Sequence, residues 1–230
     1  MKPPEVGRNE DARDELLDSE QAETIIGYLE RYKRASRDHV LVAIRWHTGI
    51  RLGSLGAIDL DDYEPEEQCF WLRHRPETGP PLKNQQPAER AIALDDYYCD
   101  VLDEYIRFHR HDVADEHGRQ PLVTSDQGRL SASQIRTEIY RLTQPCIVGH
   151  CPHDRKPMDC EAREYEHYSE CPSSLSPHTI RRSAITHQLR EGVPERIVSD
   201  RCDVSSEGLE HHYDRRTDRM KMEQRRDFIE

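Results

Sequence analysis

The 230-residue sequence contains no apolar run close to the roughly 20 residues that a membrane-spanning helix requires. No apolar segment typical of a secretory signal peptide follows Met1. Only 34% of the residues are hydrophobic and 7% are aromatic, and this composition by itself favours disorder. Positive charge is also lacking, because the formal net charge is -12; this argues against a nucleic-acid-binding protein, which usually carries a basic surface. The length nevertheless suits one domain with a buried core.

Lysine is scarce. Five of the 33 basic residues are lysines, so the other 28 are arginines. An acidic surface dominated by arginine is typical of a protein that works in molar salt, where repulsion is screened within about 3 Å. The alternative is an ordinary acidic cytosolic protein. We favour salt adaptation, and under that interpretation the net charge no longer excludes DNA as a partner.

Apolar periodicity predicts a chain that is mostly helical. Residues 1–15 are polar and are interpreted as a linker or tail. Asp18 is predicted to cap the first helix, and Gly49 to end the second. A short helical turn is expected at 53–57. Further helices are predicted over 37–48, 96–109, 131 or 133 to about 144, 177 to about 191, 194–201, 206–215 and 217–229.

The middle of the sequence changes to a β-like pattern. The runs Cys69–His74 and Arg90–Leu94 are predicted to pair as a small antiparallel sheet. Between them lies a Pro-rich stretch with Lys83, the only lysine of this region. The fold class is therefore predicted as α+β, mainly α-helical with one small antiparallel β-sheet.

Two arginines lie where an anion could bind. Arg51 follows the glycine that ends a predicted helix, and its planar guanidinium can donate two N–H groups to one phosphate. His178 and Arg181 share one face of the first turn of the helix that begins after Ser176, where free backbone N–H groups favour an anion. The alternative interpretation is solvated surface charges around a capping turn.

Tyr213 lies in the run His211–Arg216, which is rich in histidine and arginine. Nearby cations favour the phenolate, so this tyrosine is a candidate nucleophile. The alternative is a tyrosine packed at the end of a helix.

The order of these motifs resembles the catalytic domain of the tyrosine recombinases, the phage-integrase family. Thr48-Gly-x-Arg is followed by a lysine between two strands, by His-x-x-Arg at a helix start, and by a tyrosine 32 residues after Arg181. The likeness covers about residues 14–225 and looks closest to integrases of halophilic archaea. It implies that the protein comes from a virus or a mobile element. It implies a tyrosine recombinase catalytic-domain fold over 16–230, with 217–230 as a tail helix.

The resemblance also implies roles for five residues. Arg51 and Arg181 would hold the scissile phosphate and stabilise its pentacovalent transition state. Lys83 would protonate the leaving 5′-oxygen, and His178 would assist proton transfer. Tyr213 would attack phosphorus to give a 3′-phosphotyrosyl link. The chemistry implies no cofactor for catalysis.

The implied partner is double-stranded DNA, on which the full-length enzyme would self-associate as a tetrameric synapse. No membrane association is expected, and the implied location is cytoplasmic, at the nucleoid. Relatives have an N-terminal core-binding domain, which we expect to be absent here. We therefore expect weak DNA binding by this chain and a monomer in solution, with positive potential confined to one cleft.

The sequence departs from the family pattern in two places. The histidine or tryptophan expected shortly before the nucleophile is absent from the stretch 200–205, and either Arg201 or His212 could replace it. Ser54 stands where an acidic residue is expected after the first arginine, and Asp59 is a candidate to compensate. A non-catalytic DNA-binding relative is therefore the first rival hypothesis.

Four of the seven cysteines fall within 26 residues: Cys146, Cys151, Cys160 and Cys171. Four thiolates suit tetrahedral zinc, and His150, His153 or His167 could replace one of them. We favour a structural zinc site over free thiols, and interpret 145–175 as a zinc-binding insertion. A zinc-stabilised interaction module without a DNA role is the second rival hypothesis.

Overall fold

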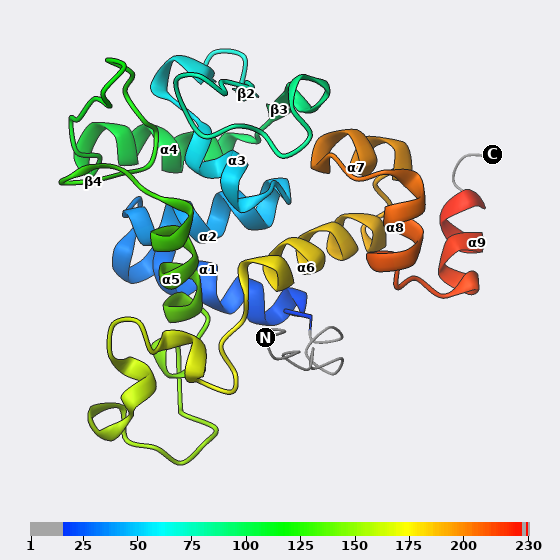
Figure 1. Ribbon diagram of the computed structural model, residues 1–230. Coiled ribbons are helices and arrows are strands. Elements are labelled where there is room, and N and C mark those ends of the chain that lie inside the picture. Colours follow the sequence, from blue (N-terminus) through cyan, green and yellow to red (C-terminus); the bar gives the residue numbers. More distant parts are fainter. Residues whose placement is uncertain (1–15, 227–228, 230) are drawn as a thin grey trace, which may run out of the picture.

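The computed structural model describes residues 16–226 and 229. The predicted linker 1–15 lies outside the described residues, as do positions 227, 228 and 230 of the predicted tail helix. None of the described helices has the length and apolar character that crossing a bilayer requires. The main elements, shown in Figure 1, are α1 (Ser19–Lys33), α2 (Arg37–Thr48), α3 (Leu52–Ala57), β1 (Tyr63–Glu64), β2 (Cys69–Leu72), β3 (Arg90–Ala93), α4 (Asp96–Phe108), β4 (Thr124–Ser125), β5 (Gly128–Arg129), α5 (Ala132–Leu142), α6 (Pro177–Arg190), α7 (Glu195–Cys202), α8 (Ser206–His212) and α9 (Asp218–Arg226).

Local capping interactions define where the helices begin. The Asp18 carboxylate accepts the backbone N–H of Gln21 at 2.7 Å at the start of α1. The side chains of Ser36, Asp95 and Ser131 cap α2, α4 and α5 in the same way. Each cap satisfies a backbone donor that the first helical turn leaves free. The predicted start at Asp18 is confirmed, and Ser131 rather than Ser133 caps α5.

The main core is built around α2. Nearly every residue of this helix is buried, and α1, α4, α5 and α6 all pack against it. Leu41 and Ile44 of α2 are fully buried with Leu29 of α1 and Ile139 of α5. Burial of this apolar surface is the main force that holds the helices together.

The β structure consists of two small sheets. In the first, β1, β2 and β3 are antiparallel, and Phe70 of β2 lies opposite Ile92 of β3. This confirms the predicted pairing of the two β-like runs. The second sheet pairs β4 with β5, so the expectation of a single sheet is wrong. These two strands have two residues each, which is too short to show a period of two.

The C-terminal helices form a second, smaller apolar cluster. Ile185 and Leu189 of α6 pack there with Val198, Cys202 and Leu209, and with Tyr213. Helix α8 ends at His212, so the predicted helix over 206–215 is wrong at its C-terminal end. The N–H groups of Tyr213 and Asp214 both bond the Leu209 carbonyl, at 3.0 and 2.8 Å. This turn fixes the backbone of Tyr213 at the helix end.

Residues 145–175 form four short 3-10 turns below α5 (Figure 1). The buried Gln144 side chain donates to the carbonyl of Ala162 at 2.6 Å. Thr143 Oγ1 accepts the N–H of Leu175 at 2.8 Å, close to the start of α6. The middle and the C-terminal end of the segment are therefore attached at the end of α5.

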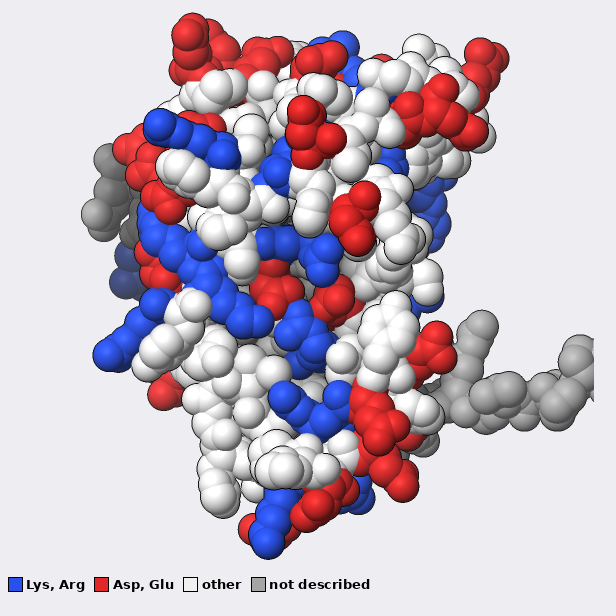
Figure 2. Space-filling view, turned by 90° about the vertical axis from the view of Figure 1, so that its left-hand side faces the viewer, with Lys and Arg blue, Asp and Glu red and all other residues white. Residues whose placement is uncertain are grey.

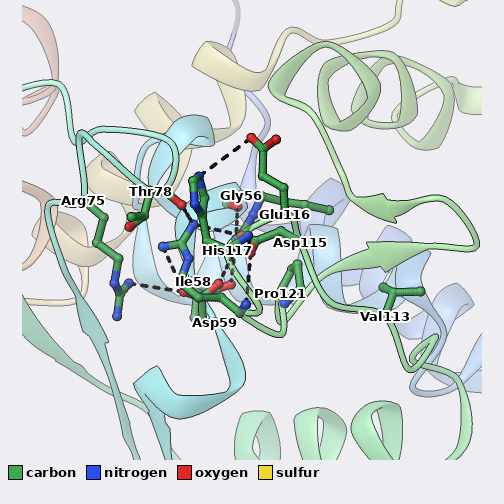
Figure 3. A network of polar contacts seen from close by, with 12 residues as sticks. Gly56, Ile58, Asp59, Arg75, Thr78, Val113, Asp115, Glu116, His117 and Pro121 are labelled. Atoms are coloured by element: carbon green, nitrogen blue, oxygen red, sulfur yellow. Dashed lines mark hydrogen bonds and ion pairs between the residues drawn. The ribbon is translucent and has the colours of Figure 1, made fainter.

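A network of arginines and aspartates connects four parts of the chain. We call it the Asp59 network; its members are Asp59, Asp62, Arg75, Asp115, Arg119 and Arg129. Figure 3 labels Asp59, Arg75 and Asp115. Asp59 is almost fully buried and pairs with Arg129, with Arg119 at 3.3 Å and with Arg75 at 3.5 Å. Arg119 also donates to the Thr78 carbonyl in the loop between β2 and β3. The network thereby attaches that loop to the body of the protein.

Figure 2 shows the face that lies on the left of Figure 1, where α4 and β4 are found. Acidic side chains gather along the upper edge and at the lower right of this face, and basic ones gather across its middle with several acidic side chains among them. Positive charge on this face is therefore compensated locally.

Candidate active site

Five residues from separate parts of the sequence line one cavity of about 550 Å³. They are Arg51, Lys83, His178, Arg181 and Tyr213. Helices α3, α5 and α6 contribute the walls, and Lys83 reaches the cavity from the loop between β2 and β3. Arg45 and Arg136 are also in the lining, which contains five basic residues and, among the described residues, no aspartate or glutamate. The five predicted residues are thus brought together in a basic cavity.

Arg181 is held in place by backbone carbonyls. It is 4% exposed, and its two terminal nitrogens donate to Gly49 O at 2.5 Å and to Cys202 O at 2.7 Å. Gly49 has a φ of +62°, and a Cβ there would lie 2.9 Å from the Cys202 sulfur. A glycine is therefore required for α2 to end close enough to α6 and α7 to bind this guanidinium.

Arg51 lies two residues after the same glycine and has a carboxylate partner. Its guanidinium pairs with the Asp203 carboxylate and donates to the Asp203 carbonyl at 2.7 Å. Asn84, next to Lys83, also donates to the Asp203 carboxylate at 3.0 Å. Asp203 is in the left-handed conformation, with φ of 52°. Sequence reasoning did not identify Asp203, because its partners are more than 100 residues away.

His178 lies in the first turn of α6. Ser176 caps this helix by accepting the N–H of Thr179 at 3.1 Å. Burial lowers the pKa of His178, and the nearby positive charges of Arg182, Arg181 and Arg45 lower it further. At neutral pH the imidazole is therefore uncharged, and it can donate one hydrogen bond and accept another.

Tyr213 follows α8 and is 9% exposed. Its carbonyl accepts the Thr186 hydroxyl of α6 at 2.7 Å. It lines the 550 Å³ cavity and also an adjoining one of about 710 Å³, and Arg51 is shared by both. The tyrosine is therefore held at the boundary of two hollows by contacts to α6 and α8.

The two residues considered as replacements for the missing histidine lie in different places. His212 lines the adjoining cavity, and its charge also acts on His178. Arg201 instead donates to Ala93 O at 2.8 Å, and it lines a separate hollow beside Trp46 and Tyr98. The structure thus brings His212, and not Arg201, to the region of Tyr213.

Ser54 and Asp59 also differ in position. Ser54 lines the basic cavity. Asp59 is a member of the Asp59 network and is not among the lining residues. Asp59 supports the loop between β2 and β3 from outside, through Arg119, instead of occupying the position of Ser54.

The four clustered cysteines do not converge. Cys146, Cys151, Cys160 and Cys171 are free thiols of intermediate exposure. Within the described part of the chain, no three or more His, Cys, Asp or Glu side chains are grouped as a metal ion requires. His153 instead bonds Ser173 at 3.0 Å, and His167 bonds Glu170 at 2.8 Å. His150 lines a hollow near the start of α1. The side chains as arranged do not fit a tetrahedral zinc site, and zinc binding stays a prediction.

Comparison with known proteins identifies the family to which this fold and cavity belong. The family described as "Phage integrase family" matches residues 15–219, so the chain belongs to the phage integrase family. The curated relatives include tyrosine recombinase XerC of Mycobacterium sp. (strain KMS), 24% identical over 198 residues. That alignment covers 86% of this chain and 53% of the relative, so the chain spans about half the length of the curated relatives it matches.

Solved structures of recombinases share the fold. The crystal structure of XerA recombinase superposes with a TM-score of 0.64 at 16% identity, over 100% of this chain and 67% of that one. The Tn1549 transposon integrase in complex with transposon right end DNA gives a TM-score of 0.64 at 15% identity, over 94% of this chain and 66% of that one. These similarities confirm the predicted fold class: mainly helical, with small antiparallel sheets.

Proposed function

We propose that the chain is the catalytic domain of a tyrosine-type, site-specific DNA recombinase that cleaves and rejoins DNA through a 3′-phosphotyrosyl intermediate. One observation carries this proposal: a cavity lined by five basic residues and no described carboxylate also contains a histidine and a tyrosine. Such a cavity is suited to a phosphodiester, because guanidinium and ammonium groups stabilise the negative charge that develops on phosphorus-bound oxygens.

The proposed reaction is a transesterification at phosphorus. The Tyr213 oxygen forms a bond to phosphorus while the bond from phosphorus to the 5′-oxygen breaks. Arg51 and Arg181 donate hydrogen bonds to the non-bridging oxygens. Lys83 gives a proton to the leaving 5′-oxygen, and the neutral imidazole of His178 accepts the proton that the Tyr213 hydroxyl loses. Attack by the 5′-hydroxyl of a second strand reverses the step. One phosphoester replaces another throughout, so the reaction needs no ATP.

The present position of Arg51 has a consequence for this mechanism. Its guanidinium is occupied by the Asp203 carboxylate, so a bound phosphate has to replace that carboxylate. Asp203 and a phosphate oxygen are both anionic acceptors, and the exchange keeps Arg51 paired. The buried Arg181 needs no such exchange, because its hydrogen bonds go to neutral carbonyls.

The proposed partner is double-stranded DNA. Similar solved structures include an integrase with transposon DNA, XerH with a difH substrate and a lambda integrase dimer with a core site. We extend that partner to this chain, with a tetrameric synapse for the full-length enzyme and a location at the nucleoid. A halophilic archaeal or viral source is proposed from the arginine excess and acidic composition.

A nicked duplex that traps the covalent intermediate tests the proposal. In such a substrate the short 5′-hydroxyl strand diffuses away after cleavage, so the protein–DNA adduct accumulates. We expect an adduct on denaturing gels that Tyr213→Phe abolishes. Tyr32→Phe is the matched control, because Tyr32 is 62% exposed on α1 and does not line the cavity, and it should keep the adduct.

The rival function is DNA binding without cleavage. It is favoured by the absence of a histidine or tryptophan from positions 200–205 and by the carboxylate that occupies Arg51. Binding to the nicked duplex without any adduct would support this rival. Absence of binding, even at high KCl, would support a module with no DNA role. Tight, sequence-specific binding by the isolated chain would contradict the expected weak affinity.

Zinc binding by residues 145–175 is a separate proposal, supported by the four clustered cysteines. It requires the segment to rearrange, because the thiols do not converge as described. Metal analysis of the purified protein should find about one zinc per chain, and Cys160→Ser should lower both the zinc content and the melting temperature. Cys69→Ser is the control outside the cluster. Unchanged metal content in Cys160→Ser would contradict the proposal.

A further inference from the structure

Arg45 is the largest fully buried side chain of the protein and lies in α2, among apolar residues. It is 1% exposed. One terminal nitrogen donates to Pro177 O at 2.6 Å. The other terminal nitrogen and Nε are buried and have no hydrogen-bond partner within the described structure. Arg45 nevertheless lines the basic cavity, next to His178 and Arg181.

The charge of Arg45 is not compensated by the protein. No aspartate or glutamate of the described residues forms an ion pair with it, and the nearest charge that acts on it is the positive charge of Arg181. Burial and, to a lesser extent, the positive charge of Arg181 together lower the pKa of Arg45 to about 9. The guanidinium is still protonated at neutral pH. A buried, unpaired cation is strongly destabilising, so an arginine at this position requires a compensating anion.

The position of Arg45 indicates where that anion binds. Its hydrogen bond to Pro177 O places the guanidinium behind the first turn of α6, the turn that carries His178. Arg181 is one turn further along the same helix and is held by Gly49 and Cys202. Two buried arginines whose charges act on each other thus line the cavity, and both donate only to neutral carbonyl oxygens.

We propose that Arg45 is a positioning residue for the phosphate site, a buried positive charge behind Arg181 that stabilises the phosphate in the transition state and fixes the start of α6. This rests on the proposed function, and it adds a residue that none of the sequence motifs contains. Because the interior has a low dielectric, a charge one layer behind the cavity wall still acts on the reacting phosphate. The arrangement also increases the positive charge at a site that lacks the expected histidine.

The first test removes the charge of the Arg45 side chain, the charge of the scissile phosphate, or both. Arg45→Met keeps most of the volume and removes the charge, and Arg45→Lys keeps the charge. We expect Arg45→Met to slow adduct formation about tenfold or more on the nicked duplex. On the same duplex with a neutral methylphosphonate at the scissile position, we expect a loss smaller than about threefold. Arg45→Lys should retain most of the preference for phosphate.

A purely structural role gives a different result. If Arg45 only anchors Pro177, then Arg45→Met slows both substrates by the same factor, and the inference is overturned. Equal activity of Arg45→Met and the unmodified protein overturns it as well. Arg129→Met is the matched control, since it removes an arginine of the Asp59 network that is paired with carboxylates; it should leave the ratio of the two rates unchanged.

The second test needs no cleavage and therefore separates this inference from the proposed function. Inorganic phosphate should raise the melting temperature of the full chain, because it binds only the folded state. Arg45→Gln keeps a side-chain donor and removes the charge, and it should lose most of this increase while Arg45→Lys retains it. An equal phosphate-induced increase in Arg45→Gln and the unmodified chain overturns the inference, even if no adduct ever forms. A phosphate effect that depends on Arg45 supports it whether or not Tyr213 cleaves DNA.

Discussion

The protein has two arginine-rich regions that differ in what compensates the charge. In the Asp59 network, Arg75, Arg119 and Arg129 each contact at least one buried or partly buried aspartate. In the basic cavity, Arg45 and Arg181 donate to backbone carbonyls alone. The network neutralises its own charge, whereas the cavity leaves positive charge without a protein partner.

The difference shows how one residue type serves two purposes. A guanidinium between carboxylates connects chain segments, and the network connects the β2–β3 loop to the segments around 59, 115 and 129. A guanidinium on neutral carbonyls is held in position but keeps its charge available for an anion. Arg51 lies between these cases, because a single carboxylate from Asp203 occupies it.

The largest expected effect is on catalysis, from a change in the cavity. Arg181→Met should lower the rate of adduct formation by about 10²–10³, because one of the donors to the transition state is lost. The melting temperature should change little, because the variant removes an uncompensated buried charge along with two hydrogen bonds. Rate measurement on the nicked duplex and a thermal melt check both parts. If Arg181→Met instead unfolds at a much lower temperature and its folded fraction forms the adduct at the unmodified rate, Arg181 has a structural role like that of the arginines in the Asp59 network.

The next effect is on stability, from a change in the network. Arg129→Met leaves the buried Asp59 without its nearest partner, and breaking a buried pair costs about 3–5 kcal/mol. The free energy of unfolding from denaturant titration measures this loss. Asp59→Asn combined with Arg129→Met should restore part of it, since the buried carboxylate that has lost its nearest partner is then neutral. If Arg129→Met unfolds at the same denaturant concentration as the unmodified chain, the ion pairs of the Asp59 network do not stabilise the fold as this comparison requires.

A smaller effect is expected at Arg51, which is paired with a single carboxylate. Asp203→Asn removes the negative charge that occupies Arg51, so Arg51 becomes available to phosphate. We expect the affinity for inorganic phosphate or the nicked duplex to rise about threefold to tenfold at low salt. Asp200→Asn, on the last part of α7, is the matched control and should change affinity less. Weaker binding by Asp203→Asn would show that the carboxylate supports Arg51 instead of competing for it.

The smallest effect concerns the protonation of His178. Its pKa is below the ordinary value, because of burial and the neighbouring arginines. The unfolded chain therefore takes up a proton at this residue at higher pH than the folded chain does, so this group contributes less stability as pH falls below about 6.5. Bound phosphate should raise the pKa of His178, since it offsets the arginine charges. An NMR titration of the imidazole, with and without phosphate, measures this shift; Arg129→Met should leave it unchanged.

The sequence was a good guide where the signal is local. The Ser176 cap, the glycine at 49 and the alternating runs of β2 and β3 all depend on residues a few positions apart, and the structure has them as predicted. The end of α8 was predicted too late, because the turn of Tyr213 and Asp214 onto Leu209 depends on packing against α6. Strands β4 and β5 were missed because they are too short for a pattern.

For the site, the sequence identified the five residues whose motifs have a fixed order, and the structure brings them into one cavity. It did not identify Asp203, Arg45 or the Asp59 network. Each of these depends on contacts between residues far apart in the chain: Asp203 with Arg51, Arg45 with Pro177, and Arg119 with Thr78. An arginine in the apolar run of α2 is visible in the sequence, but its orientation toward the cavity is not.

By itself the sequence determined the helical class, the caps and the main sheet, because these are encoded by short-range spacing, and it contained the motifs that we propose to bind phosphate. Tertiary structure alone decided which arginines are neutralised and which keep their charge. That outcome depends on whether a carboxylate or a carbonyl lies at the end of each side chain, and the partner comes from a distant part of the chain. The net charge of -12 describes the whole protein, whereas the proposed chemistry depends on one cavity lined by positive charge.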